Sequence, residues 1–217
     1  MPRSKRISTP VLVLACAVAA PDLAAQVRIG FQAGLVSSTL GGEAVASLGS
    51  RTGVTGGAFL AVPLSRVVTL QPGAAWIEKG VEETAFDVTD RIAFSYIALP
   101  LLVRFTLPSE VSVAAHAVLG PVLNVEMSCA VESESNNDRI SVDCRSPLLQ
   151  GGIPTKSTDI GFQFGGGVTI LPRNRVNLVA QVAYELGLTS IDDSTPQFDV
   201  KNRAIIFSAG VTYAIGQ

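Results

Sequence analysis

Apolar residues alternate with polar or glycine residues along most of this 217-residue chain. In "RVNLVAQVAYELG", residues 175–187, one row of side chains is apolar, and the row between them contains Asn177, Gln181 and Glu185. Successive side chains of a β-strand point to opposite faces, so each such segment has one apolar face and one mixed face. A period of two predicts strands that separate an apolar environment from a polar one.

Eight segments follow this alternation, at approximately residues 26–36, 53–63, 67–79, 91–107, 110–126, 158–171, 174–187 and 203–216. The connections between them alternate in length. Those near 64–66, 108–109 and 172–174 are short, whereas those at 37–52, 80–90, 127–157 and 188–202 are long and polar. Short turns at one end and long loops at the other are typical of membrane barrels. We therefore predict an all-β fold, an eight-stranded antiparallel up-and-down transmembrane β-barrel, whose closure leaves no unpaired strand edge in lipid.

The N-terminus has the layout of a secretory signal peptide. Hydrophobic residues make up 47% of the chain, yet the longest apolar run, residues 11–20, is too short for a membrane-spanning helix, which needs about 18 residues. This run follows the basic "MPRSKR" and precedes the small residues of "LAAQ". We predict a signal peptide at 1–25 and an outer-membrane barrel domain at 26–217. Cys16 suggests a lipoprotein as an alternative, but too few apolar residues precede it.

Charge and cysteine content limit the partners and cofactors. Cleavage would remove three of the 16 basic and one of the 18 acidic residues, leaving 13 and 17 and a net charge of −4. Such a chain has no basic field for nucleic acid. Cys129 and Cys144 would remain, and export to an oxidising compartment predicts a disulfide between them. With one histidine and no C-x-x-C spacing, we expect no zinc site and no cofactor.

The mixed row of each strand is predicted to point into the barrel. In "IALPLLVRF", Leu99, Leu101 and Phe105 belong to the apolar outward row, which turns Arg104 inward. An eight-stranded barrel is just wide enough for its side chains to fill it. We expect the inward polar residues to form a hydrogen-bonded, salt-bridged network, with a narrow polar conduit as the alternative. This set comprises Arg28, Gln32, Gln71, Arg104, His116, Asn124, Glu126, Gln163, Asn177, Gln181 and Glu185.

Pro100 and Pro121 lie within two of the predicted strands. Neither can donate a backbone hydrogen bond, so we expect bulges or bends at both positions.

Three stretches resemble a known family: "GGAFLAVPLSRVVTLQPGAAWIEKG", "YIALPLLVRF" and "DIGFQFGGGVTI". Their order and spacing resemble the PorT-like outer-membrane β-barrel family. Gly73 and Trp76 depart from the usual glutamate and tyrosine of that pattern, and the chain ends in Gln217 rather than an aromatic residue. The resemblance implies an eight-stranded barrel that the barrel-assembly machinery inserts into the bacterial outer membrane. One namesake group is tied to protein secretion, but most members have no assigned activity.

These observations favour a monomer, surrounded by outer-membrane lipid, with a structural, adhesive or binding role through its extracellular loops. A narrow passive pore, or a transport- or secretion-associated barrel, is the first alternative. A soluble periplasmic lipocalin-like barrel that binds a ligand is the second. Its apolar residues would face inward, opposite to our assignment.

Catalytic and metal-binding roles are weakly supported by the sequence. His116, with Ser112 or Ser128 and Glu126, is the only set for an acyl hydrolase, but His116 is predicted to face inward and no G-x-S-x-G motif is present. The acidic residues from Glu132 to Asp143 lack the spacing of a calcium loop. We therefore expect neither an enzyme nor a metal site.

Overall fold

The computed structural model describes residues 26–42, 49–85, 88–109, 111–135, 138–146, 154–170, 175–194 and 199–215. The predicted signal peptide lies outside these residues and stays a prediction. Nine strands occur in the described ranges: β1 (Arg28–Gly41), β2 (Gly49–Pro63), β3 (Val68–Ala85), β4 (Val88–Thr106), β5 (Val113–Ser135), β6 (Asp138–Asp143), β7 (Thr158–Ile170), β8 (Val176–Gly187) and β9 (Lys201–Ala214). The described residues contain no helix long and apolar enough to cross a membrane.

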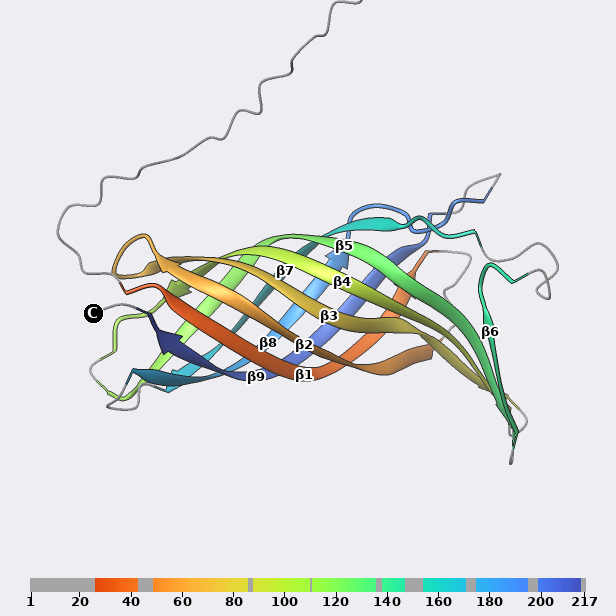
Figure 1. Ribbon diagram of the computed structural model, residues 1–217, viewed down its shortest axis with the longest axis horizontal. Coiled ribbons are helices and arrows are strands. Elements are labelled where there is room, and N and C mark those ends of the chain that lie inside the picture. The colour runs from red at the N-terminus through yellow and green to blue at the C-terminus, as the bar shows by residue number, and fades with distance from the viewer. Residues whose placement is uncertain are drawn as a thin grey trace, which may run out of the picture.

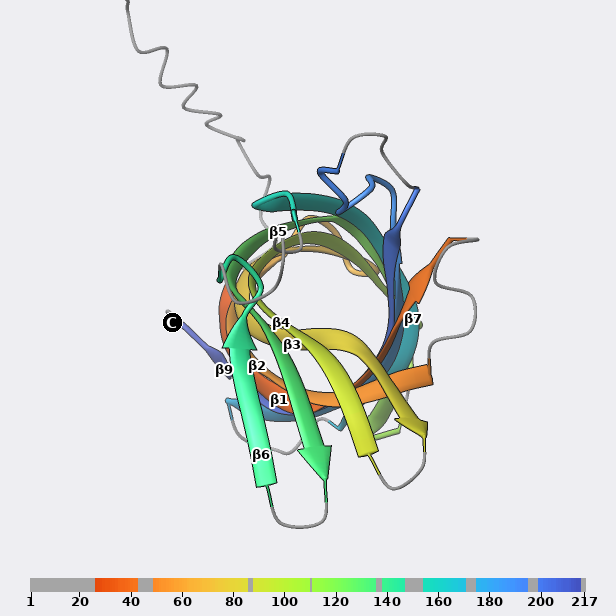
Figure 2. The same ribbon diagram turned by 90° about the vertical axis from the view of Figure 1, so that its right-hand side faces the viewer.

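Eight of the strands close into a ring, as predicted. The order is β4-β3-β2-β1-β9-β8-β7-β5, and β5 pairs back onto β4. All pairings are antiparallel. Figure 2 shows this ring end-on, with β6 outside it, paired to the edge of β5. Figure 1 shows the C-terminus and the short turns at one end, which we call the turn end, and the long connections at the other, the loop end.

Alternation of side chains around the ring follows the predicted faces. In β8, Val182 is 47% exposed, whereas its neighbour Gln181 is only 8% exposed. Phe31, Leu178 and Phe207 also lie on the outer surface. Apolar residues therefore face outward and polar residues inward, which is the reverse of a lipocalin-like barrel. That second alternative is wrong.

Strands β3 and β4 continue through the segment 80–90 that the sequence led us to place in a loop. Their pairing extends to Ala85 and Val88. The prediction failed because it relied on apolar residues in the outward row. In β3 that apolar row ends at Trp76, and the outward positions after Trp76 are polar, as at Glu82. Outside the bilayer a strand needs no apolar outer face, so the alternation loses its apolar side there.

The predicted loop 127–157 likewise contains the end of β5 and all of β6. A register shift opposite Ser95 and Tyr96 reorients β5 at this point. Strand β6 then pairs with β5 from Ala130 to Ser135. We call the extension of β3, β4 and β5 together with β6 the loop-end sheet; it comprises residues 82–85, 88–91, 130–135 and 138–143. Figures 1 and 2 show its two hairpins projecting from the ring.

The prolines do not produce the expected bulges. Pairing of β4 with β5 keeps one register on both sides of Pro100, and pairing of β5 with β7 runs through Pro121 without a shift. Pro121 points outward, and its missing donor changes the local hydrogen bonding without inserting a residue. The recorded shifts lie elsewhere, near Ser50–Thr55 and Ser95–Tyr96.

Candidate functional site

A buried ion pair crosses the lumen in its loop half. Lys79 Nζ lies 2.5 Å from Glu185 Oε1, and the two side chains are 0% and 2% exposed. Asn124 donates to the same carboxylate oxygen at 2.8 Å. The ammonium also lies 5.4 Å from the centroid of the Tyr96 ring, within range of a cation–π interaction. Strands β3 and β8 stand four places apart in the ring of eight, so this pair joins opposite walls.

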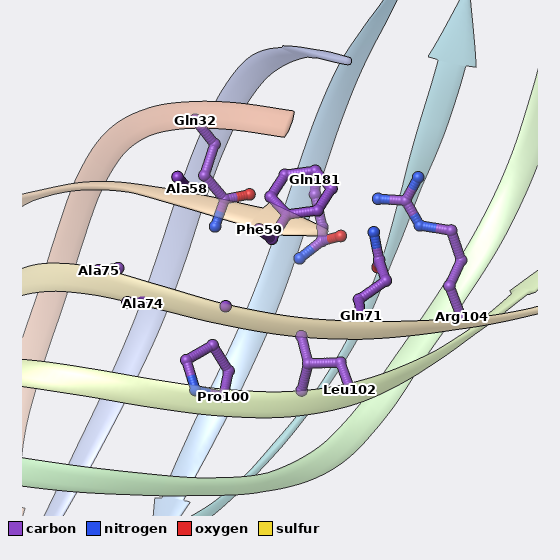
Figure 3. Close-up of a pocket in the computed structure, with 11 residues that line it drawn as sticks. Gln32, Ala58, Phe59, Gln71, Ala74, Ala75, Pro100, Leu102, Arg104 and Gln181 are labelled. Carbon is purple, nitrogen blue, oxygen red and sulfur yellow. The ribbon is translucent and has the colours of Figure 1, made fainter. Parts of the chain in front are cut away.

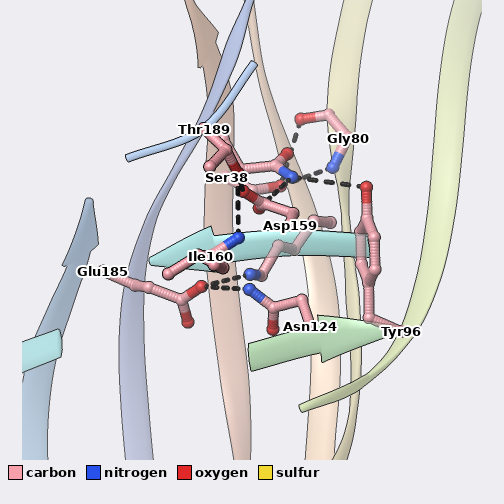
Figure 4. A network of polar contacts seen from close by, with 10 residues as sticks. Ser38, Gly80, Tyr96, Asn124, Asp159, Ile160, Glu185 and Thr189 are labelled. Carbon is pink, nitrogen blue, oxygen red and sulfur yellow. Dashed lines mark hydrogen bonds and ion pairs between the residues drawn. The ribbon is translucent and has the colours of Figure 1, made fainter. Parts of the chain in front are cut away.

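A second group of hydrogen bonds adjoins the ion pair (Figure 4). Asp159 accepts hydrogen bonds from Asn202 Nδ2 and Thr189 Oγ1, both at 2.9 Å. Asn202 also donates to the Tyr96 hydroxyl at 3.3 Å. Ser38 Oγ accepts from the backbone amide of Gly80 at 2.9 Å. These groups connect five strands across the loop half of the lumen.

Apolar side chains pack beside this network and include the disulfide. Cys129 and Cys144 are bonded, with Cα atoms 5.4 Å apart. Both are buried in one cluster with Phe94, Leu40 and Ile191, the last from the β8–β9 connection. Both cysteines fall within 127–157, which the sequence predicts to be a long polar loop, but the disulfide lies in an apolar cluster continuous with the barrel. This cluster and the polar network together lie in the loop half of the lumen.

The turn half of the lumen contains polar side chains with few partners. Arg104, His116 and Gln181 are all buried there. His116 Nδ1 lies 3.2 Å from Thr169 Oγ1, while its Nε2 has no hydrogen-bond partner. Arg28, near the open rim, donates to the carbonyl of Arg175 at 3.3 Å.

Residues of the predicted lumen set occupy three environments. Asn124 and Glu185 belong to the loop-half network. The turn half contains Arg28, Gln32, Gln71, Arg104, His116, Asn177 and Gln181, of which all but Arg28 and Gln32 are buried. Gln163 is also buried and pairs with Glu185 in the β7–β8 register, so it lies beside the loop-half network. Glu126 lies apart from both groups, at the register shift of β5, where it accepts from Arg145 Nη2 at 3.0 Å and Thr155 Oγ1 at 3.3 Å.

Sequence reasoning missed Lys79, Tyr96, Asp159 and Asn202. Lys79 is an even number of residues from the inward Gln71, and Tyr96 is an even number from the inward Arg104. The alternation therefore predicts that both side chains point inward. A count in steps of two from Gln163 likewise reaches Asp159, so its inward face was also available in the sequence.

The structure does not bring together the residues considered for catalysis. His116 and Glu126 lie ten positions apart on β5, which corresponds to about 33 Å along an extended strand. Ser128 is exposed beyond the register shift, and Ser112 is exposed at the turn end. Among the described residues, no group of three histidine, cysteine, aspartate or glutamate side chains is arranged to hold a metal ion.

Three charged side chains link strands on one face of the loop-end sheet. Arg91 Nε lies 2.6 Å from Glu82 Oε2 on β3, and Arg91 Nη1 lies 2.7 Å from Glu134 Oε2 on β5. Hydrogen bonds to Glu82 and then Glu134 raise the pKa of the Arg91 guanidinium above its usual value. The arginine thus crosslinks three strands beyond the apolar band of the barrel.

Comparison with known proteins gives the family. The model of the outer membrane protein beta-barrel domain matches residues 19–193. No curated protein sequence matches the chain closely enough to count as a relative. Among solved structures, Neisserial surface protein A is similar, with a TM-score of 0.50 and 13% identity over 86% of this chain and 97% of that one.

Two further solved structures resemble the fold less closely. Outer membrane protein OprG from Pseudomonas aeruginosa has a TM-score of 0.45 and 12% identity, over 89% of this chain and 97% of that one. Ail, the attachment invasion locus protein of Yersinia pestis, has a TM-score of 0.42 and 14% identity, over 87% and 99%. Since the family model covers more than half of the sequence, this chain belongs to the outer membrane protein beta-barrel domain family and lies in the bacterial outer membrane.

Proposed function

We propose that this protein is a non-conducting, non-enzymatic barrel that acts by binding through its loop-end sheet. The observation that carries this proposal is the extension of β3, β4 and β5, joined by β6, beyond the ring. Strands that only span a bilayer need about 9 to 11 residues, whereas β5 has 23. The additional length builds an ordered surface outside the membrane.

This surface has features of a strand-pairing site. Among the described strands, β6 pairs only with β5, so no described strand occupies its other backbone edge. Ile140 on this strand is 63% exposed. An extended peptide can add to a free edge through backbone hydrogen bonds, and a side chain such as Ile140 would contribute specificity. We therefore favour a protein partner that binds in extended conformation.

A hairpin-shortened variant tests the surface role. Ala130 and Asp143 are paired, so residues 131–142 can be replaced by a two-residue Asn-Gly turn that keeps both cysteines. Bacteria that display the wild-type barrel should adhere to protein-coated surfaces more strongly than cells that display the shortened one. Equal surface amounts of the two folded barrels are the control. Equal adhesion by the two variants would contradict the proposal.

Closure of the lumen is supported by the buried network and the apolar cluster. We expect the refolded barrel to give no conductance steps in a planar bilayer under conditions in which a porin gives them. Reproducible conductance would instead favour the passive-pore alternative. The PorT-like resemblance stays a prediction, and no secretion role is drawn from it.

A further inference from the structure

We propose that the turn half of the lumen contains a binding site for a small inorganic anion, centred on Arg104. Arg104 is only 8% exposed. Its guanidinium has no carboxylate or other hydrogen-bond partner among the described residues, and its Nε is buried without an acceptor. A buried charge without a partner is strongly destabilising. An anion would supply the missing partner.

Charges in the lumen are separated along the barrel axis. The lumen carboxylates Glu126, Asp159 and Glu185 all lie toward the loop end, and each has hydrogen-bond partners. Glu185 lies four residues beyond Gln181 on β8, about 13 Å further along the strand. Among the described residues, no carboxylate lines the space beside Arg104. The turn half therefore has a positive field that no described group neutralises.

Hydrogen-bond donors surround the same space. Figure 3 shows the Arg104 guanidinium on the same side of the space as the side-chain amides of Gln71 and Gln181, and Gln32 also lines the space. Gln181 lies within hydrogen-bonding reach of His116. Gln32 and Gln71 make no hydrogen bond to another described side chain, so their NH₂ groups remain available as donors. The Phe59 ring forms an apolar wall of the space. This ring packs directly on Gly30, since a Cβ atom on Gly30 would lie 2.3 Å from the nearest ring atom. The site combines one fixed cation with neutral donors and a dry side.

The size of the space restricts the ligand. The volume open to the centre of a water-sized sphere is about 20 Å³, and one water needs roughly 10 to 15 Å³ by this measure. The space therefore suits a monatomic halide and is too small for a phosphorylated metabolite. This inference is independent of the proposed surface function.

Halide titration of the refolded mature barrel in an uncharged detergent tests the site. Sodium chloride replaces sodium gluconate at constant ionic strength, because gluconate is too large for the space. Binding to the folded state alone raises stability with ligand concentration. We expect the urea midpoint of the wild type to rise with chloride and that of Arg104→Met not to change. In gluconate alone, Arg104→Met should be at least as stable as the wild type, because it lacks the unpaired charge.

Two further measurements make the result decisive. Arg66→Met, which alters an exposed arginine in the β2–β3 turn, should respond to chloride as the wild type does. Crystals of the wild type soaked in bromide should show an anomalous peak within hydrogen-bonding distance of Arg104. A wild-type midpoint that ignores chloride, a chloride response retained in Arg104→Met, or the absence of a bromide peak would overturn the proposal. If Arg104→Met fails to fold, the chloride titration of the wild type and the bromide peak still test whether an anion binds at Arg104.

Discussion

Breaking the buried ion pair between Lys79 and Glu185 should destabilise the barrel more than any other single polar change in the lumen. Glu185→Gln keeps the shape of the side chain but removes its charge. Lys79 would then be left fully buried, with a neutral amide oxygen in place of the carboxylate and the Tyr96 ring beside it. Removing one partner of a buried pair typically costs about 3 to 5 kcal/mol, because the remaining charge is uncompensated.

Lys79→Met provides the complementary test. Glu185 would keep the hydrogen bond from Asn124 at 2.8 Å, but it would lose the one cation that pairs with it among the described residues. The contact with Tyr96, worth about 0.5 to 2 kcal/mol, would also be lost. We expect a cost of about 3 to 5 kcal/mol, which is a large part of a typical unfolding free energy of about 5 to 15 kcal/mol.

The double variant separates the pair from its surroundings. Lys79→Met combined with Glu185→Gln removes both charges, so its cost should fall below the sum of the single costs by at least about 1 kcal/mol. Urea unfolding of the barrel in lipid vesicles would be followed by the fluorescence of Trp76, the only tryptophan in the chain. Single costs below about 1 kcal/mol, or strictly additive effects, would show that the pair does not stabilise the fold in this way.

Three other predictions follow from the same structure. Val182→Arg, at the middle of an outward row, should lower the unfolding free energy by about 2 to 4 kcal/mol, whereas Ile160→Arg, near the loop end, should lower it by at most about 1 kcal/mol. Similar losses for the two variants, measured by unfolding in vesicles, would contradict our placement of the bilayer. Tyr96→Phe should cost about 1 kcal/mol by removing the acceptor of the Asn202 hydrogen bond, measured by the same unfolding curve. Denatured, unreduced mature protein should label at no thiol, and reduction should lower stability by up to about 3 kcal/mol while circular dichroism still shows the barrel.

The number of strands in the ring, their pairing order and their side-chain faces were predictable because the bilayer and the lumen impose opposite demands on alternate residues. In β8 the outward Val182 and the inward Gln181 were assigned correctly from the period alone. This signal depends on lipid. Where β3 leaves the bilayer, Glu82 occupies the outward row and the contrast between the faces is lost, so the extension of the strand was predicted as a loop.

Partners across the lumen were not predictable from the same pattern. A period of two places Lys79 and Glu185 inward, but their meeting depends on the stagger of strands around the closed ring, which sets the height of each residue along the axis. The same stagger brings Asn124 to Glu185, and it leaves Arg104 at a height where no described carboxylate lies opposite. One inward-facing pattern therefore produces a neutralised, closed half and a cationic, unpaired half. The difference between them is a property of the assembled barrel and of no single strand.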